Sequence, residues 1–127
     1  MSSPSTKIPQ LKDLNTIIGK LEEALKMEKS EIIRDSAIKR FELCFDLAWK
    51  SIKSYANREG LECLSPRSCL KTAFQLKLIP YDENWLKMLN DRNLTVHIYK
   101  EKYAEHVYSR LPQYVDMFKQ LAKKLSE

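Results

Sequence analysis

The apolar residues of this chain recur with the 3.6-residue period of an amphipathic α-helix over most of its length. The first stretch with this period has an apolar face made of Leu11, Leu14, Ile17, Ile18, Leu21 and Leu25. The second has an apolar face made of Ala37, Phe41, Cys44, Phe45, Ala48, Trp49, Ile52 and Tyr55. Ser30 and Glu31 suit the start of this second helix, which is expected to run to about Arg58 and to end at Gly60.

The second half of the chain is expected to contain one short helix and two further helical elements. Ser65 followed by Pro66 has the form of an N-cap and a first helical residue, where the missing proline N–H costs nothing. The short helix should end before Pro80, and the next element should begin near Asp82 and Glu83. The last helix has an apolar face made of Ala104, Val107, Tyr108, Leu111, Val115, Phe118, Leu121 and Leu125.

Pro112 lies inside this last apolar stripe, which keeps its phase on both sides of the proline. Because the phase is kept, we expect the proline to kink the helix and not to end it. The predicted fold is therefore all-α, an up-and-down helical bundle of four long elements plus one short helix, in a single domain of residues 8–127. Residues 1–7 are expected to form a disordered N-terminal tail.

Composition excludes several classes of protein. The 127 residues include two glycines, which argues against sandwiches, barrels and glycine-rich phosphate loops, because these need many tight turns. No apolar run reaches the ~18 residues of a membrane-spanning helix and no signal peptide is evident, so we expect a cytoplasmic protein without a membrane partner. Cys44, Cys63 and Cys69 lack the paired spacing of zinc or redox sites, and Cys44 is expected in the core.

The net charge of +5 suits a polyanionic partner such as RNA. Lysines on solvated helix faces explain the same charge without any partner, so charge is supporting information only.

The side chains that are able to bind or cleave a phosphodiester lie close together in the last third of the chain. A guanidinium, a carboxamide, an imidazole and a phenol fall within eight residues, at Arg92, Asn93, His97 and Tyr99. Arginine matches phosphate oxygens with a planar fork of donors, and histidine exchanges a proton near neutral pH, so no metal or cofactor is expected.

Helix geometry limits how this motif can work. On a regular helix, Arg92 lies about 140° from His97, so a straight isolated helix would not present both side chains to one phosphate. A distorted helix, a long reach of the arginine or a composite cleft between two copies of the chain would each solve the problem, and we favour the cleft of a homodimer. The structural alternatives are a buried His97 and a salt bridge from Arg92 to Asp91, Glu42 or Asp46.

Two charged residues of the second helix, Arg40 and Asp46, lie beside large apolar residues, where an unpaired charge would be costly. We expect them to pair with the motif and orient it, and a plain interhelical salt bridge is the alternative. His106 matches no position of the motif and is expected at the surface.

The spacing Arg-x4-His-x-Tyr resembles the signature of the HEPN superfamily, small helical proteins that include metal-independent ribonucleases. The similarity extends to the segments Arg40–Glu42, Phe45–Lys50, Ser65–Arg67, Ala73-Phe74, Leu78-Ile79, Trp85 and Asp91–Tyr99. Together they resemble the nucleotidyltransferase substrate-binding protein family, the HEPN half of two-gene modules with a minimal nucleotidyltransferase. The resemblance covers roughly residues 10 to 125.

This resemblance implies a toxin–antitoxin-like module in which the chain, as a homodimer, is the substrate-binding partner of a minimal nucleotidyltransferase. The motif would bind a nucleotide or an RNA phosphate, and Tyr99 would accept nucleotidyl groups. The chain lacks the Gly-Ser dyad and paired aspartates of a nucleotidyltransferase, so it is not the transferase itself.

Two other functions stay open. One is an active metal-independent endoribonuclease, in which His97 deprotonates the 2′-hydroxyl, Arg92 stabilises the phosphorane and Asn93 positions the phosphate or His97, giving a 2′,3′-cyclic phosphate. The other is a non-catalytic dimeric adaptor with a vestigial site.

Overall fold

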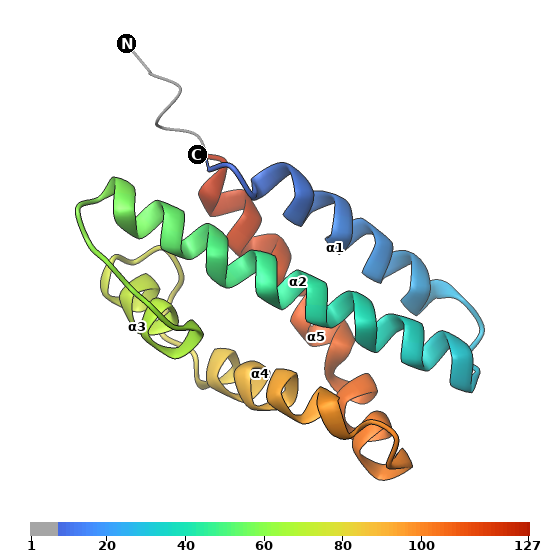
Figure 1. Cartoon of the computed structure of the whole chain (residues 1–127). Helices are drawn as coiled ribbons and strands as arrows, with labels where there is room; N and C mark the ends of the chain where they lie inside the picture. Colours follow the sequence, from blue (N-terminus) through green and yellow to red (C-terminus); the bar gives the residue numbers. More distant parts are fainter. Residues whose placement is uncertain (1–7) are drawn as a thin grey trace.

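The computed structural model describes residues 8–127 and confirms the all-α fold (Figure 1). The helices are α1 (Leu11–Lys26), α2 (Glu31–Arg58), α3 (Pro66–Gln75), α4 (Glu83–Leu94) and α5 (Glu101–Leu125), with a 3₁₀ turn, η2 (Thr95–His97), between the last two. Within this range no residue forms a β-strand. The tail expected over residues 1–7 lies outside the described residues.

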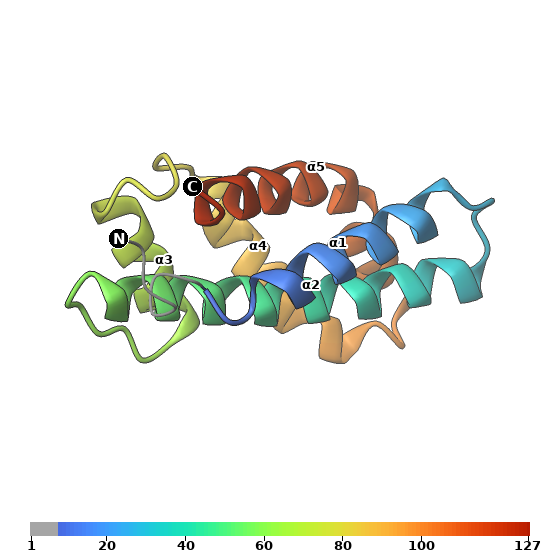
Figure 2. The same ribbon diagram turned by 90° about the horizontal axis from the view of Figure 1, so that it is seen from above.

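The long helices α1, α2 and α5 pack against one another, while α3 and α4 lie along the side of α2 (Figures 1 and 2). Aromatic rings occupy the middle of this bundle. The ring of Phe41 stacks on Tyr114 at 5.4 Å between centroids and lies 6.2 Å from Phe118, which meets Trp85 edge to face. All four are buried, so the core joins α2, α4 and α5 around one ring cluster.

Side-chain caps start α2 and α4, and a glycine in a left-handed conformation follows the end of α2. The Ser30 hydroxyl accepts from the Ile33 amide at 3.1 Å, and the Asp82 carboxylate accepts from the Asn84 amide at 2.9 Å. These caps satisfy amides that have no intrahelical partner. Gly60 follows the end of α2 with a φ of +82°, a left-handed conformation that glycine adopts without steric cost. As expected, α5 continues through Pro112.

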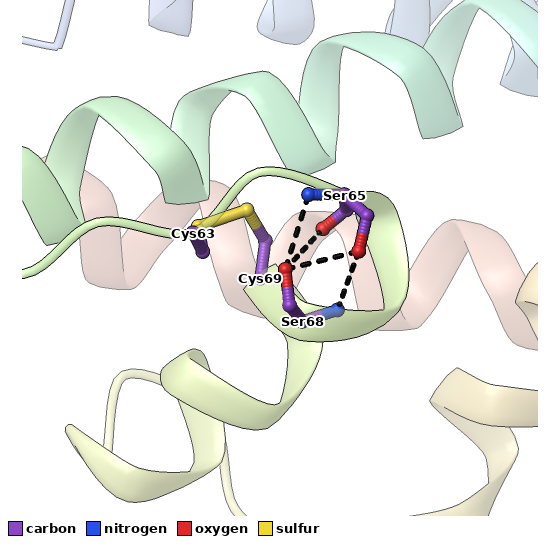
Figure 3. The surroundings of a disulfide bond; sticks show 4 residues. All are labelled: Cys63, Ser65, Ser68 and Cys69. Atoms are coloured by element: carbon purple, nitrogen blue, oxygen red, sulfur yellow. Dashed lines mark hydrogen bonds between the residues drawn. A yellow bond between two sulfur atoms is a disulfide. The ribbon is translucent and has the colours of Figure 1, made fainter.

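A disulfide between Cys63 and Cys69 joins the loop after α2 to the first turn of α3, and sequence reasoning missed it (Figure 3). Both cysteines are buried, with the Ser65–Ser68 capping box between them. Cys44 stays a free thiol in the core, where burial raises its pKa to about 12. Disulfides are typical of oxidising compartments. The cytoplasmic location stays a prediction, and no helix of residues 8–127 is long and apolar enough to span a bilayer.

The disulfide should contribute measurably to stability. It closes a short loop with a sequence separation of 6 residues. Loop-closure entropy then predicts that reduction lowers the free energy of unfolding by about 2 kcal/mol. Urea unfolding with and without reductant measures this difference, and the Cys63→Ala/Cys69→Ala variant serves as the control because reductant should leave it unchanged. Equal midpoints for the oxidised and reduced wild type would contradict the assignment.

Candidate functional site

The motif from Arg92 to Tyr99 does not lie on one regular helix, so the break in the helix that the sequence left open as one alternative is present. Helix α4 ends at Leu94, one 3₁₀ turn follows, and α5 begins only at Glu101. Thr95 explains the break, because its hydroxyl donates to the carbonyl of Arg92 at 2.7 Å and its amide donates to the same oxygen. This local bond replaces the α-helical pattern with a tighter turn.

The side chain of Arg92 is held against α2. Its Nε and Nη2 donate to the two carboxylate oxygens of Asp46 at 3.2 and 3.1 Å, and Nη1 donates to the Thr95 hydroxyl at 3.1 Å. Nη1 also lies 3.4 Å from the carboxylate of Glu42. The bidentate pairing fixes the plane of the guanidinium, and two carboxylates balance its charge. In this conformation Arg92 serves as an anchor, which is the structural alternative raised from the sequence.

The two residues expected to support the motif behave differently. Asp46 pairs with Arg92, as expected. Arg40 donates to the backbone carbonyl of Lys20 at 2.6 Å and therefore ties α2 to α1, so the expected contact with the motif does not form. The reason is geometric: six residues of helix separate the two side chains by about 120° around the axis of α2.

The remaining motif residues are exposed at the turn between α4 and α5. The Tyr99 side chain is 75% exposed, and its hydroxyl lies 3.4 Å from Nδ1 of His97. Asn93 is exposed and makes no side-chain hydrogen bond to any described residue. No hydrogen bond joins Arg92 to His97 within residues 8–127. The structure therefore pairs His97 with Tyr99 and Arg92 with Asp46, and Arg92 and His97 do not contact each other through a hydrogen bond.

The other end of this turn is held by a buried arginine that the sequence analysis did not single out. Arg34 of α2 is 4% exposed and contacts Glu101 at 3.3 Å and Glu105 at 3.0 Å, both in the first turns of α5. Hydrogen bonds from Lys29 and Arg34 lower the pKa of Glu105. The turn is therefore attached to α2 twice, through Arg92 before it and through Arg34 after it.

A cluster of polar side chains that the sequence analysis did not identify surrounds Asp91, whose side chain is buried beside the motif. The Tyr114 hydroxyl donates to it at 2.6 Å, while Nε2 of His106 lies 3.3 Å away and Nη1 of Arg110 lies 3.7 Å away. Burial, and then the bond to Asp91, raise the pKa of Tyr114. His106 is exposed, as expected, yet its ring reaches Asp91. His106, Arg110 and Tyr114 follow one another at four-residue intervals on α5, so they share one helix face. This spacing was the signal in the sequence that could have identified the cluster.

Among the described residues, no three or more His, Cys, Asp or Glu side chains lie close enough together to bind a metal ion. The polar groups that this turn exposes are an imidazole and a phenol in contact, with Lys100 and Lys102 close by. The Nζ atoms of these lysines lie 5.8 and 5.0 Å from the ring centroid of Tyr103. The arrangement suits proton transfer and anion binding.

Comparison with known proteins places these features in context. A family model described as "Nucleotidyltransferase substrate binding protein like" matches residues 9–127. A solved structure from Thermus thermophilus is 35% identical, with a TM-score of 0.84 over 90% of this chain and 99% of the other. A Haemophilus influenzae structure, described as the fold of a substrate binding domain of a nucleotidyltransferase, is 21% identical, with a TM-score of 0.82 over 92% and 99%. A search of curated proteins found no match.

Proposed function

This chain belongs to the nucleotidyltransferase substrate binding protein-like family, and from that premise we propose that it is the partner of a minimal nucleotidyltransferase. The segment that it presents to the transferase is the turn between α4 and α5, with Tyr99 as the acceptor of a nucleotidyl group. One observation carries the proposal: the Tyr99 phenol is exposed on a firmly attached turn, in contact with the imidazole of His97.

The contact between His97 and Tyr99 supplies a proton path. A phenol with an ordinary pKa near 10 is a weak nucleophile at neutral pH and needs a base. As the Tyr99 oxygen attacks the α-phosphorus of a nucleoside triphosphate, Nδ1 of His97 accepts the phenolic proton. The bond from the α-phosphorus to the bridging oxygen breaks, and pyrophosphate leaves. The transferase partner would bind the triphosphate and its metal.

The charges around the turn favour an anionic substrate. Lys100 and Lys102 have no ion-pair partner among the described residues and flank the ring of Tyr103. A nucleotidyl group on Tyr99 would add negative charge beside these lysines. In a toxin–antitoxin-like module this modification would switch the site off, because the added phosphate occupies the surface that another phosphate would use.

The ribonuclease alternative needs a second copy of the chain. Arg92 of one copy would have to leave Asp46 and meet a phosphate beside His97 of another, with Asn93 exposed nearby. The exposure of Val96 (67%), the residue before His97, favours a homodimer through the surface that carries the turn. A dimer without this exchange would be the non-catalytic adaptor. RNA cleavage that persists in EDTA and ends with His97→Ala would distinguish the nuclease from the adaptor.

Nucleotidylation can be tested directly. Incubation with the cognate nucleotidyltransferase, ATP and Mg²⁺ should add nucleotide mass to the peptide that contains Tyr99, as read by mass spectrometry. Tyr99→Phe should abolish the label, and His97→Ala should slow labelling by at least about 10²-fold, the lower end of the range for a general base. Tyr103→Phe is the matched control and should be labelled normally. Label on another residue, with an active partner, would rule out Tyr99 as the acceptor.

The dimer is tested by light scattering at micromolar concentration, which should give about twice the chain mass of 14.9 kDa. Val96→Lys should yield monomers, because it places a charge in the apolar face of the interface. Leu64→Lys changes a residue that is 72% exposed in the α2–α3 loop and should leave the dimer intact. A monomeric wild type would exclude the composite cleft and, with it, the ribonuclease mechanism.

A further inference from the structure

A hollow of about 650 Å³ lies far from the motif, between the α3–α4 connection and the last turns of α5. Figure 2 shows this connection beside the C-terminal part of α5, at the opposite end of the bundle from the turn before α5. The volume falls within the range of small-molecule binding sites. None of the residues that line it is acidic. The hollow is therefore large enough for a ligand and has no carboxylate among its lining residues.

One wall of the hollow is aromatic. The rings of Phe74 and Tyr81 meet edge to face, with centroids 5.2 Å apart at an interplanar angle of 68°. Tyr81 is 67% exposed although it is a large aromatic residue, while Leu78 and Ile79, which also line the hollow, are buried. A planar heterocycle can stack on such a surface, as bases do on exposed aromatic side chains.

Two lysines, Lys77 and Lys124, and the amide of Gln120 provide the polar groups that line the hollow. Lys77 has no ion-pair partner among residues 8–127. Lys124 has one loose contact, to Glu127 of its own helix end at 3.7 Å. The two ammonium groups can therefore donate hydrogen bonds to an anionic ligand without breaking a close ion pair.

The backbone of Lys77 provides an independent observation. Its φ is +59°, the only positive value at a non-glycine position among the described residues. Its amide donates to the carbonyl of Phe74 at 3.1 Å, and the amide of Leu78 donates to that of Ala73 at 3.0 Å. This is the helix-ending pattern in which glycine usually occupies the left-handed position. The chain accepts a strained conformation here and places a cationic side chain at the edge of the hollow, and such strain is often found at binding sites.

We propose that this hollow binds a nucleoside monophosphate group. The base stacks on the Phe74–Tyr81 wall, the phosphate lies between Lys77 and Lys124, and Gln120 hydrogen-bonds to the base or the sugar. A free nucleotide and the 5′-phosphorylated end of an RNA strand share this chemistry. The site is separate from Tyr99 and His97, so it does not depend on the proposed nucleotidylation.

The proposal is tested by calorimetric titration of the oxidised, full-length chain with the four nucleoside 5′-monophosphates and with a 5′-phosphorylated RNA trinucleotide. At least one should bind, and the matching nucleoside and ribose 5-phosphate should each bind at least tenfold more weakly. Binding of the trinucleotide alone identifies an RNA end as the ligand and supports the site. Absence of binding in both arms, or equal binding of inorganic phosphate, overturns it.

Variants locate the binding to the hollow. Lys77→Gly removes the cation and relieves the left-handed strain, so it should raise the melting temperature while weakening binding at least tenfold. Tyr81→Ala should weaken binding similarly, and Lys123→Ala, on the same helix as Lys124 but outside the hollow, should not. Undiminished affinity in both Lys77→Gly and Tyr81→Ala would overturn the assignment even if nucleotides bind. Normal labelling of Tyr99 in these variants would show that the two sites are independent.

Discussion

Ion pairs to α2 hold the turn between α4 and α5 at both of its ends, and the arrangement of the candidate site depends on them. Before the turn, Arg92 binds Asp46 through two hydrogen bonds and lies close to Glu42. After the turn, the buried Arg34 binds Glu101 and Glu105. Since both attachments are made to one long helix, a short irregular segment keeps a defined position without being buried itself.

This attachment changes the role of the motif's arginine. An Arg–His pair suggests joint action on a phosphate, but the guanidinium of Arg92 is already balanced by carboxylates and faces α2. The groups left exposed are His97 and Tyr99, whose contact suits proton transfer from a phenol. Family membership and this geometry support the same proposal, in which the chain is a modifiable partner of a nucleotidyltransferase. Ribonuclease activity would require Arg92 to exchange its partners.

The helices could be predicted from the sequence because period and capping are local signals. Ser30, Ser65 and Asp82 cap their helices, and the apolar stripes lie on the buried faces. The attachment of the turn to α2 could not be predicted, because it depends on contacts between Arg92 and residues 46 or more positions away along the chain. The Cys63–Cys69 disulfide was hidden by an odd number of cysteines and an unpaired spacing, although the two cysteines flank the capping box that starts α3.

Hydrogen exchange at the amides of Ile98 and Lys100 tests most directly whether the pairing of Arg92 with Asp46 holds the turn. These amides donate to the carbonyls of Thr95 and His97 within the turn. Asp46→Asn and Arg92→Gln should each speed their exchange by roughly fivefold, as expected for a pair that contributes about 1 kcal/mol. The double variant should show no further increase, and the amide of Leu61 should be unaffected. Unchanged exchange at Ile98 and Lys100 in both single variants would contradict the account.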